Sequence, residues 1–556
     1  MAGTGTSCKW MIVIATVWIQ AFTGTNFNFS AYSTQLKSVL GTSQVHLNYL
    51  ATASDMGKAL GWTSGLALLY LSPSTVLFIT ALTGFVSYGL QWLLIQNILP
   101  LPYVLVFLLC MFAGCSISWF NTICFVLCIK NFPTNTAIAL SLTSSFNGIS
   151  PALYTLLAKA ISLNDDSVYL LLNSVVPLIT SFVALIPILH QPNREPGSTE
   201  GYRCDSILFL FLNILAVLTG LYLFVLNSIS TTVYTARILF SVAILLLVLP
   251  LGIPGIVFAT EWARQSIHSN LCLDGPAGFN FVELDDLEFH EELLEREDCS
   301  GKGKQEHEGC YKMVLEKDQL TVLGEEHPAH LLVRKPDFWL YFIAYFCGGT
   351  IGLVYSNNLG QIAQSLGNGR KTSTLVTLYS SCSFFGRLLS AAPNFICGKS
   401  YFARTGWLAI ALVPTPVAFF LLAATGNGIA LQVGTSLIGL SSGFIFSAAL
   451  AITSELFGPN SAGVNHNILI INIPVGSLLY GLLAAIIYDT NAGSSFGKLG
   501  LFKDGALVCM GRQCYWETFV WWGCISMLGL ASSVLLYLRT RPTYEGFKRN
   551  RIILTQ

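Results

Sequence analysis

The chain of 556 residues is too apolar to be a set of water-soluble domains. Hydrophobic residues make up 53% and charged residues 10% of it, and its mean hydropathy is +0.62, whereas soluble domains carry about 25% charged residues. The formal net charge is zero and no basic stripe is present, so nucleic-acid binding is excluded. We therefore predict a chain whose solvent is largely lipid.

Segments long and apolar enough to cross a bilayer as helices recur along the whole chain. The predicted spans are residues 8–29, 46–70, 74–97, 102–129, 135–160, 167–190, 205–227, 235–259, 337–359, 372–395, 405–425, 428–455, 462–488 and 517–538. They lack the alternation of a membrane β-barrel. The fold class is thus an all-α polytopic membrane protein of about 14 helices, in which 46–70, 135–160 and 462–488 are the most polar spans.

The basic residues of the connecting loops favour cytosolic termini. Fourteen Lys and Arg residues fall on the side of the N-terminus and seven on the other side. The same orientation places the loop 261–336 in the cytosol. Between Phe281 and Asp298 this loop carries nine acidic residues and one Arg, so we expect a largely disordered tether. The alternative is a docking segment for a regulatory protein.

Short segments of the first half recur in the second half at nearly one spacing. Gly114, Ser116, Trp119 and Asn135 match Gly439, Ser441, Phe444 and Asn460 at an offset of 325, Tyr154 matches Tyr480 at 326, and Gly57-Lys58 matches Gly386-Arg387 at 329. Two parallel halves of six spans are the repeat pattern of the major facilitator superfamily. We predict a half at 8–190, two inserted spans at 203–260, a half at 337–540 and a basic cytosolic tail at 541–556.

Three stretches point to a family within that superfamily. WIQAFTGTNFNFSAYSTQLKSVLG near the start, SDMGKALGWTSGLALLYLSP after it and the late SELFGPNSAG resemble the plant nodulin-like proteins of the "nuclear fusion defective" type. The resemblance implies a carrier but no particular substrate. The chain departs from the superfamily's charged inner-loop motif, because YLSPSTV after span 46–70 has no charge and Asn394 stands where an acidic residue is expected.

Charges inside the predicted spans are the first candidates for function, because one at mid-span costs about 2.5–3.5 kcal/mol against lipid. Asp55 and Lys58 are three residues apart and so share a helix face. They are either a structural ion pair or a gating and coupling pair. Arg387 occupies the repeat position of Lys58, whereas Asp55 maps to Phe384. Arg387 therefore needs a partner from elsewhere.

Residues facing the solute are expected on the first and fourth helices of each half, which line the central cavity in this architecture, as the resemblance implies. The candidates are Trp18, Thr23, Asn26, Trp119, Asn121, Tyr355, Asn357, Asn358 and Phe444. Their amides and hydroxyls suit a carboxylate or a polyol equally. Packing between helices by polar residues is the alternative interpretation.

Three further features complete the candidate sites. His466 opens span 462–488 and titrates near neutral pH, so it is either a proton relay or part of a capped helix end. Lys130 and Glu455 stand at related inner positions and are predicted to pair across the halves. Cys509 and Cys514 lie in a non-cytosolic loop with Gly511 between them, and we predict a disulfide there.

The sequence as a whole predicts a secondary-active carrier of a small polar solute, with an organic anion as one option, working by alternating access and coupled to protons or another ion. A non-transporting receptor or scaffold on the same fold is the alternative. We predict no enzyme activity, no cofactor and no metal site, because no P-loop and no catalytic or ligand constellation occurs. Plasma membrane and endomembrane both remain open.

Overall fold

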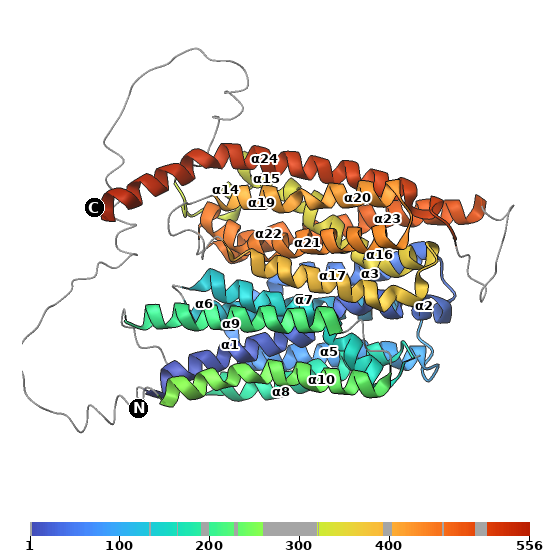
Figure 1. The fold of residues 1–556 in the computed structure, drawn as a ribbon, viewed down its shortest axis with the longest axis horizontal. Helices are drawn as coiled ribbons and strands as arrows, with labels where there is room; N and C mark the ends of the chain where they lie inside the picture. The colour runs from blue at the N-terminus through green and yellow to red at the C-terminus, as the bar shows by residue number, and fades with distance from the viewer. Residues whose placement is uncertain are drawn as a thin grey trace, which may run out of the picture.

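The computed structural model describes residues 3–132, 135–163, 165–190, 200–226, 232–259, 320, 322–392, 403–458, 461–494 and 509–555. These residues form helices that run along one long axis, and none of them forms a strand (Figure 1). Eleven segments are long and apolar enough to span a membrane. The protein is a multi-pass integral membrane protein.

The first half of the chain forms a bundle that begins with an interrupted helix. Its elements are α1 (Gly3–Thr23), η1 (Thr25–Asn28), α2 (Phe29–Leu40), α3 (Gln44–Ala59), α4 (Trp62–Tyr70), α5 (Pro73–Ile95), α6 (Tyr103–Asn131), α7 (Thr136–Ile161) and α8 (Val168–Leu189). The two inserted helices follow. They are α9 (Glu200–Leu226) and α10 (Val233–Val248), and α10 continues through η3 (Leu249–Leu251) in a span that reaches Ala259.

The second half repeats this order. Its elements are α14 (Ala329–Leu332), α15 (Pro336–Tyr345), the π-helical turn η5 (Phe346–Thr350), α16 (Ile351–Ser365), η6 (Gly369–Lys371), α17 (Thr372–Leu389), α19 (Arg404–Leu412), α20 (Pro414–Ala424), α21 (Gly428–Phe457), α22 (Ala462–Ile470), α23 (Asn472–Ser494) and α24 (Gln513–Thr555). The predicted acidic segment 281–298 and Asn394 lie outside the described residues. Helix α24 continues into the predicted basic tail 541–556, as far as Thr555.

Three predicted spans are helical but too polar to be counted among the eleven. They are α3 with α4, α7 and α17. The sequence analysis correctly named 46–70 and 135–160 as polar spans but missed 372–395. It also named 462–488 as polar, whereas that segment is apolar enough to be one of the eleven spans. All three polar helices pack at the boundary between the halves, α7 against α17 and α3 against α23. They contact protein in place of lipid, so hydroxyls and amides are tolerated on them.

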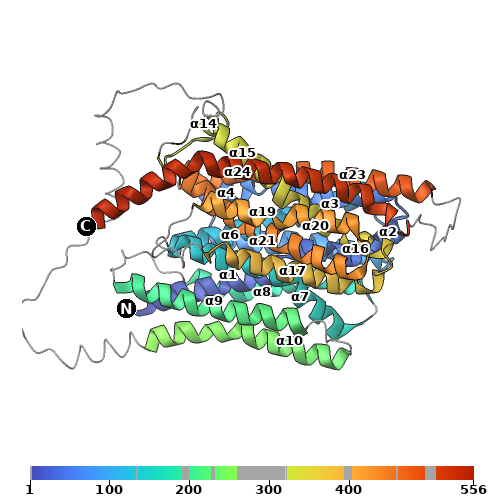
Figure 2. The same ribbon diagram turned by 45° about the horizontal axis from the view of Figure 1, so that its top comes forward.

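The two halves form two layers, with the N-terminal half below and the C-terminal half above in Figure 1. The N-terminus, the C-terminus and the far end of α10 lie at the same end of the bundle (Figure 1). The inserted helices α9 and α10 lie along one flank of the bundle (Figure 2), where they pack against α7. An even number of inserted spans keeps the second half parallel to the first.

Glycines set the register of the structural repeat. Gly57 and Gly114 let α3 and α6 touch backbone to backbone, because a Cβ at Gly57 would overlap the carbonyl of Met111 and one at Gly114 would overlap that of Ser54. In the second half Gly386 meets Leu440 and Gly443 meets Ser383 in the same way. Each of these positions is 329 residues from its counterpart. Gly114 therefore corresponds to Gly443, and the predicted match to Gly439 is wrong by one helical turn.

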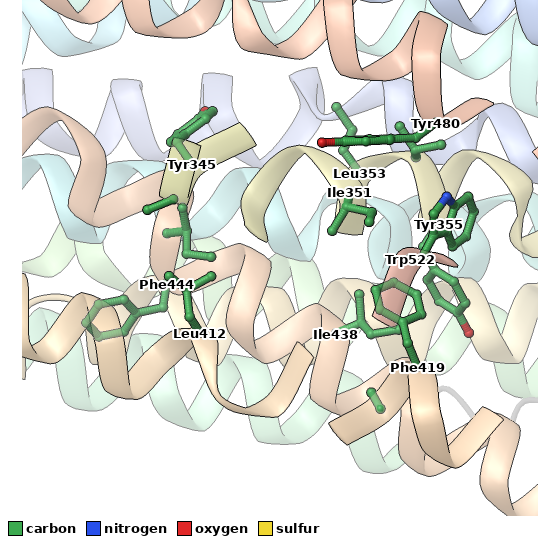
Figure 3. Close-up of a cluster of buried hydrophobic side chains, with 14 of the residues drawn as sticks. Tyr345, Ile351, Leu353, Tyr355, Leu412, Phe419, Ile438, Phe444, Tyr480 and Trp522 are labelled. Atoms are coloured by element: carbon green, nitrogen blue, oxygen red, sulfur yellow. The ribbon is translucent and has the colours of Figure 1, made fainter. Parts of the chain in front are cut away.

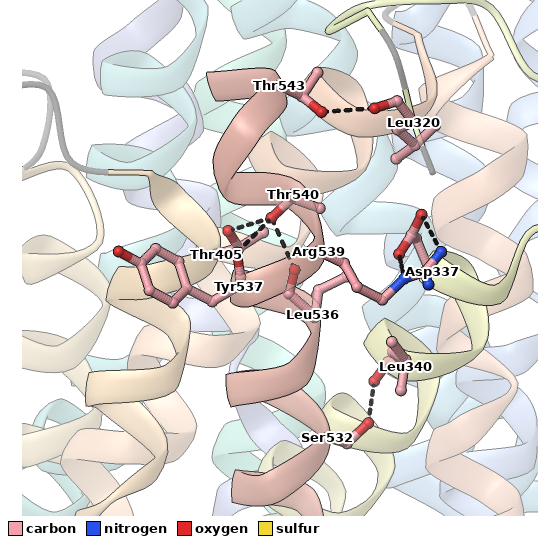
Figure 4. Close-up of polar contacts among 10 residues, drawn as sticks. All are labelled: Leu320, Asp337, Leu340, Thr405, Ser532, Leu536, Tyr537, Arg539, Thr540 and Thr543. Carbon is pink, nitrogen blue, oxygen red and sulfur yellow. Dashed lines mark hydrogen bonds and ion pairs between the residues drawn. The ribbon is translucent and has the colours of Figure 1, made fainter. Parts of the chain in front are cut away.

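The C-terminal half is further tied together by polar contacts between its first and last helices (Figure 4). Arg539 of α24 donates from Nε to Asp337 Oδ1 of α15 at 2.6 Å, and both side chains are at most 3% exposed. Thr540 bonds Thr405 at 2.8 Å beside them. A charge pair this deeply buried was not predicted, because Asp337 and Arg539 lie at the two ends of the half.

Candidate functional site

The buried ion pair of α3 is the centre of the candidate site. Lys58 Nζ donates to Asp55 Oδ1 at 2.6 Å, as the three-residue spacing predicted. Asp55 is 1% exposed and Lys58 is 12% exposed. Since neither side chain faces lipid, the pair avoids the cost of a charge in hydrocarbon.

A small cavity opens beside this pair. Its polar lining comes from Asn26, Tyr32, Ser54, Asp55, Lys58, Tyr88, Gln91 and Asn357. Phe29 adds an aromatic wall. The cavity thus combines one carboxylate and one ammonium group with amides and hydroxyls, which suits a small polar solute.

Asn357 brings the second half of the molecule to this site. It lies on α16, and its Nδ2 is 3.5 Å from Asp55 Oδ2, a long hydrogen bond across the two halves. Gln361, one turn further on α16, donates to Ser33 Oγ at 3.2 Å. The cavity is therefore lined by both halves, as a carrier site at a repeat interface would be.

Arg387 stands at the repeat position of Lys58 but in different surroundings. Its Nη1 donates to the backbone carbonyl of Ser144 in α7 at 2.9 Å, and its guanidinium lies 5.9 Å from the ring of Phe446. Its Nε is buried without a hydrogen-bond partner, and the side chain is 8% exposed. Within the described part of the chain no carboxylate pairs with it.

Serine hydroxyls from both halves gather around Arg387. Ser141 and Ser390 both donate to the Arg387 carbonyl, at 2.9 and 2.7 Å. Ser447 Oγ lies 2.8 Å from Ser390 Oγ and 3.1 Å from Ser144 Oγ. These hydroxyls thus satisfy the backbone carbonyl of Arg387 and one another, whereas its guanidinium keeps a buried Nε without a hydrogen-bond partner among the described residues.

The other cavity candidates of the N-terminal half lie elsewhere. Trp18 does not face the cavity, because its Nε1 donates to the Leu247 carbonyl in the inserted helices at 2.7 Å. Trp119 donates to Thr63 Oγ1 at 3.0 Å. Asn121 accepts from Gln20 at 2.9 Å within the same half, and Thr23 is buried with no hydrogen bond to its hydroxyl within the described residues. Of these five candidates, only Asn26 lines the cavity.

In the C-terminal half, two of the four candidates belong to the core (Figure 3). Tyr355 is fully buried and shares a hydrogen bond with Thr435 at 2.7 Å, and Phe444 is buried in the same hydrophobic cluster. Asn358 donates to the Val354 carbonyl of its own helix at 3.0 Å. Asn357, next to it in sequence, points the other way and reaches the cavity. Successive residues on a helix point in different directions around its axis, so the two asparagines have different surroundings.

The predicted pair of Lys130 with Glu455 is not formed among the described residues. Glu455 is bound within its own half, by Arg404 and by the hydroxyl of Tyr544 at 3.0 Å, while Lys130 is exposed. His466 does not open its helix, because α22 begins at Ala462. Its Nδ1 is buried without a hydrogen-bond partner in the described structure.

Cys509 and Cys514 are joined by a disulfide, with their Cα atoms 5.9 Å apart. Gly511 between them has φ +110°, a conformation that favours glycine. Its amide donates to the Ser365 carbonyl at 2.8 Å, and Arg512 donates to the Ala423 carbonyl. The ring therefore attaches the start of α24 to α16 and α20.

Eight of the twelve residues that line the cavity escaped the sequence analysis, among them two pairs with large side chains. Phe29 and Tyr32 lie just beyond the interruption at η1, and Tyr88 and Gln91 lie on α5. The signal that could have found the last two is their spacing, since a glutamine and a tyrosine three residues apart share one face of an otherwise apolar span. Tyr88 is held by a hydrogen bond to Thr25 at 2.8 Å.

Solved structures with the same fold are membrane transporters. The chain superimposes on a D-xylose–proton symporter with a TM-score of 0.53 at 11% identity, covering 95% of this chain and 96% of that one. For the xylose transporter XylE from E. coli the TM-score is 0.52 at 10% identity, with 94% and 97% covered. Identities this low show the fold alone, which is that of the major facilitator superfamily.

Sequence comparison narrows the fold to one family. Residues 9–255 match the family model described as Nodulin-like, and residues 321–545 match the C-terminal domain of NFD4. A "probable transporter MCH1" of Yarrowia lipolytica is 27% identical over 191 residues, 33% of this chain and 38% of that protein. Protein NUCLEAR FUSION DEFECTIVE 4 of Arabidopsis thaliana is 55% identical over 551 residues, 98% of this chain and 91% of that protein. The chain therefore belongs to the plant nodulin-like family, built on the major facilitator fold.

Proposed function

We propose that the protein is a secondary-active transporter of a small organic anion that works by alternating access. The observation that carries this proposal is the pair of repeat-related buried charges, Lys58 and Arg387, of which Lys58 borders a cavity lined by both halves. The related transporters with this fold support a carrier. The anion follows from charge, because Arg387 has no carboxylate partner within the described chain.

Asp55 would provide the proton coupling in this proposal. A proton that binds the Asp55 carboxylate breaks its ion pair with Lys58 and leaves the ammonium group free for a carboxylate of the solute. The site stays neutral in charge before and after this exchange. That neutrality matters because an unpaired charge inside the bundle is expensive.

Uptake by the purified protein in proteoliposomes tests the function. The panel contains mono- and dicarboxylates, neutral sugars and amino acids, each with and without an inward proton gradient. We expect saturable, gradient-stimulated uptake of at least one carboxylate, and at least a tenfold loss in Arg387→Gln and in Lys58→Met. The matched control is Arg541→Gln, since Arg541 is 57% exposed in an i,i+4 pair outside the site.

A receptor or scaffold is the second candidate. The charge-free stretch YLSPSTV that follows α4 favours it, because the charged inner-loop motif of carriers is missing there. A folded protein that moves no member of the panel under any gradient would support this candidate and contradict transport.

We also propose that the termini and the loop 261–336 share the cytosolic side and that the loop binds a regulatory protein. The bias of Lys and Arg in the loops supports the orientation. Protease added outside sealed, right-side-out vesicles should leave residues 281–298 intact. Cleavage there would overturn this orientation.

A further inference from the structure

The second inserted helix, α10 with its continuation, is fixed to the N-terminal half by hydrogen bonds at three levels. These are Ser7 Oγ to the Pro254 carbonyl at 3.0 Å, Trp18 Nε1 to the Leu247 carbonyl at 2.7 Å, and Arg237 Nε to the Ala160 carbonyl at 3.0 Å. These hydrogen bonds lie near both ends and in the middle of the span 233–259. The first inserted helix is joined to the second, since Tyr222 Oη donates to the Leu239 carbonyl at 2.8 Å, so the inserted pair belongs with that half.

Helix α9 also reaches across to the C-terminal half, where it packs against α17. The contact is made at Gly220, where a Cβ would overlap the ring of Phe384 and come within 3.1 Å of Phe385 Cζ. No hydrogen bond from α9 to α17 is formed among the described residues. The inserted pair is therefore bonded to one half and only packed against the other.

Phe384 is enclosed on its other side by α7. Its ring lies 5.8 Å from that of Phe146, and a Cβ at Gly148 would come within 2.9 Å of the Phe384 backbone nitrogen. Phe384 itself is fully buried. Gly220 of α9 thus faces the ring of Phe384 and Gly148 of α7 faces its backbone, and together these glycines form a socket that this residue of the opposite half fills.

The socket lies close to the middle of the bilayer. Phe384 is 12 residues from the start of α17, which is about 18 Å at 1.5 Å per residue, in a hydrocarbon core of about 30 Å. When one rigid half rocks against another, their ends move apart most and the mid-depth contact moves least. Packing without hydrogen bonds permits small rotations at such a point.

We propose that Phe384 in the socket of Gly148 and Gly220 is the pivot of the rocking motion, and that the inserted helices complete this socket. The inference rests on the alternating-access function proposed above. It assigns a role to α9 and α10 that neither six-helix half provides. Any side chain at position 220 should push against Phe384 and lock the halves in one state.

Distances between spin labels on the two halves test the pivot without a solute. Labels at Lys130 and Arg541 report the end of the bundle that carries the termini, and labels at Ser38 and Ile429 report the opposite end. All four positions are exposed. The protein is reconstituted in nanodiscs with its free cysteines replaced by serine or alanine.

We expect two distance populations for each pair in the parent protein and a single one in Gly220→Leu. Phe384→Ala added to Gly220→Leu should restore two populations, because it empties the socket. Gly252→Ala in the same insertion is the control, since its added Cβ meets no atom within 4 Å. If Gly220→Leu does not fold, Gly220→Ala replaces it, with at least a threefold fall of the minor population expected.

The outcomes separate the two proposals. A single population in the parent protein would contradict alternating access and the pivot with it. Two unchanged populations in a folded Gly220→Leu or Gly220→Ala variant would overturn the pivot alone. So would a failure of Phe384→Ala to restore the second population in a folded protein.

Discussion

The two copies of the repeat place a cation at the same point of the same helix but surround it differently. Lys58 has Asp55 one turn before it and borders a cavity. Arg387, at the matching position, has Phe384 in that place, and its guanidinium donates to the backbone carbonyl of Ser144. The first site is a neutral pair, whereas the second is a cation without a carboxylate among the described residues.

The scaffold under these two sites is the same, and glycine explains why. The backbones of α3 and α6, and of α17 and α21, approach too closely for any side chain at Gly114 or Gly443. Side chains that point away from this contact carry no such restriction. Comparison of the copies teaches that close helix packing preserved the geometry while the charges diverged.

The first helices of the two halves also occupy similar places but carry different side chains where they meet the last helix. Asp337 begins α15 and is bound by Arg539 of the last helix. At the corresponding place in the N-terminal half, the thiol of Cys8 in α1 lies within 3.5 Å of the His190 carbonyl after the last helix of that half. The same two helices meet in both halves, through an ion pair in one and a weak thiol contact in the other.

The largest effect is expected at the close glycine contacts that both copies of the repeat share. Gly114→Val and Gly443→Val should each abolish folding, because a branched side chain would overlap the carbonyls of Ser54 and Ser383. Yield of monodisperse protein in detergent is the measurement. Gly65→Ala, where a Cβ meets no atom within 4 Å, is the control and should keep its yield. Normal folding of either valine variant would refute the shared register.

The second largest effect is expected at the ion pair that joins the first and last helices of the C-terminal half. Arg539→Met should destabilise the protein by about 3–5 kcal/mol, because Asp337 is left charged and buried. Thermal unfolding in detergent measures the change. Arg541→Met, two residues further along α24 and 57% exposed, should leave the transition unchanged. Equal effects of the two substitutions would contradict the buried pair.

A moderate effect is expected for the pair of the N-terminal half. Asp55→Asn and Lys58→Met should each lower stability, and the double variant should be less harmful than the sum by about 1–3 kcal/mol. The reason is that each single substitution leaves one charge without its partner. The unfolding midpoints of the parent protein, the two single variants and the double variant complete a double-mutant cycle. Strict additivity would show that Asp55 and Lys58 do not interact.

The smallest effect is expected at the disulfide, which lies only in the C-terminal half. The short ring between Cys509 and Cys514 removes little chain entropy, so Cys514→Ala should cost about 2 kcal/mol or less. Alkylation without reductant, followed by mass spectrometry, detects the bond. Label on both cysteines in protein from intact membranes would refute it. Gly511→Ala should loosen the same end of α24, because φ +110° is strained for alanine.

The sequence alone determined the membrane class, the two halves with their inserted pair, and the contacts between residues close in the chain. Hydropathy reports directly whether a segment can lie in lipid, and a spacing of three residues places Asp55 and Lys58 on one face of any helix. The spacing of Cys509 and Cys514 around Gly511 is equally local. The last two of these conclusions depend only on residues within one or two helical turns.

Only the tertiary structure decided which helix faces meet. It turned Trp18 towards the inserted helices and Tyr355 into the core, and brought Asn357 to Asp55 across the halves. It also moved the match of Gly114 from Gly439 to Gly443. Polar residues on a buried helix give no sign of the direction they face, because protein and cavity satisfy them equally well. The rotation of each helix is set by close packing against its neighbours, above all at glycines such as Gly114 and Gly220, and those neighbours lie far away in the sequence.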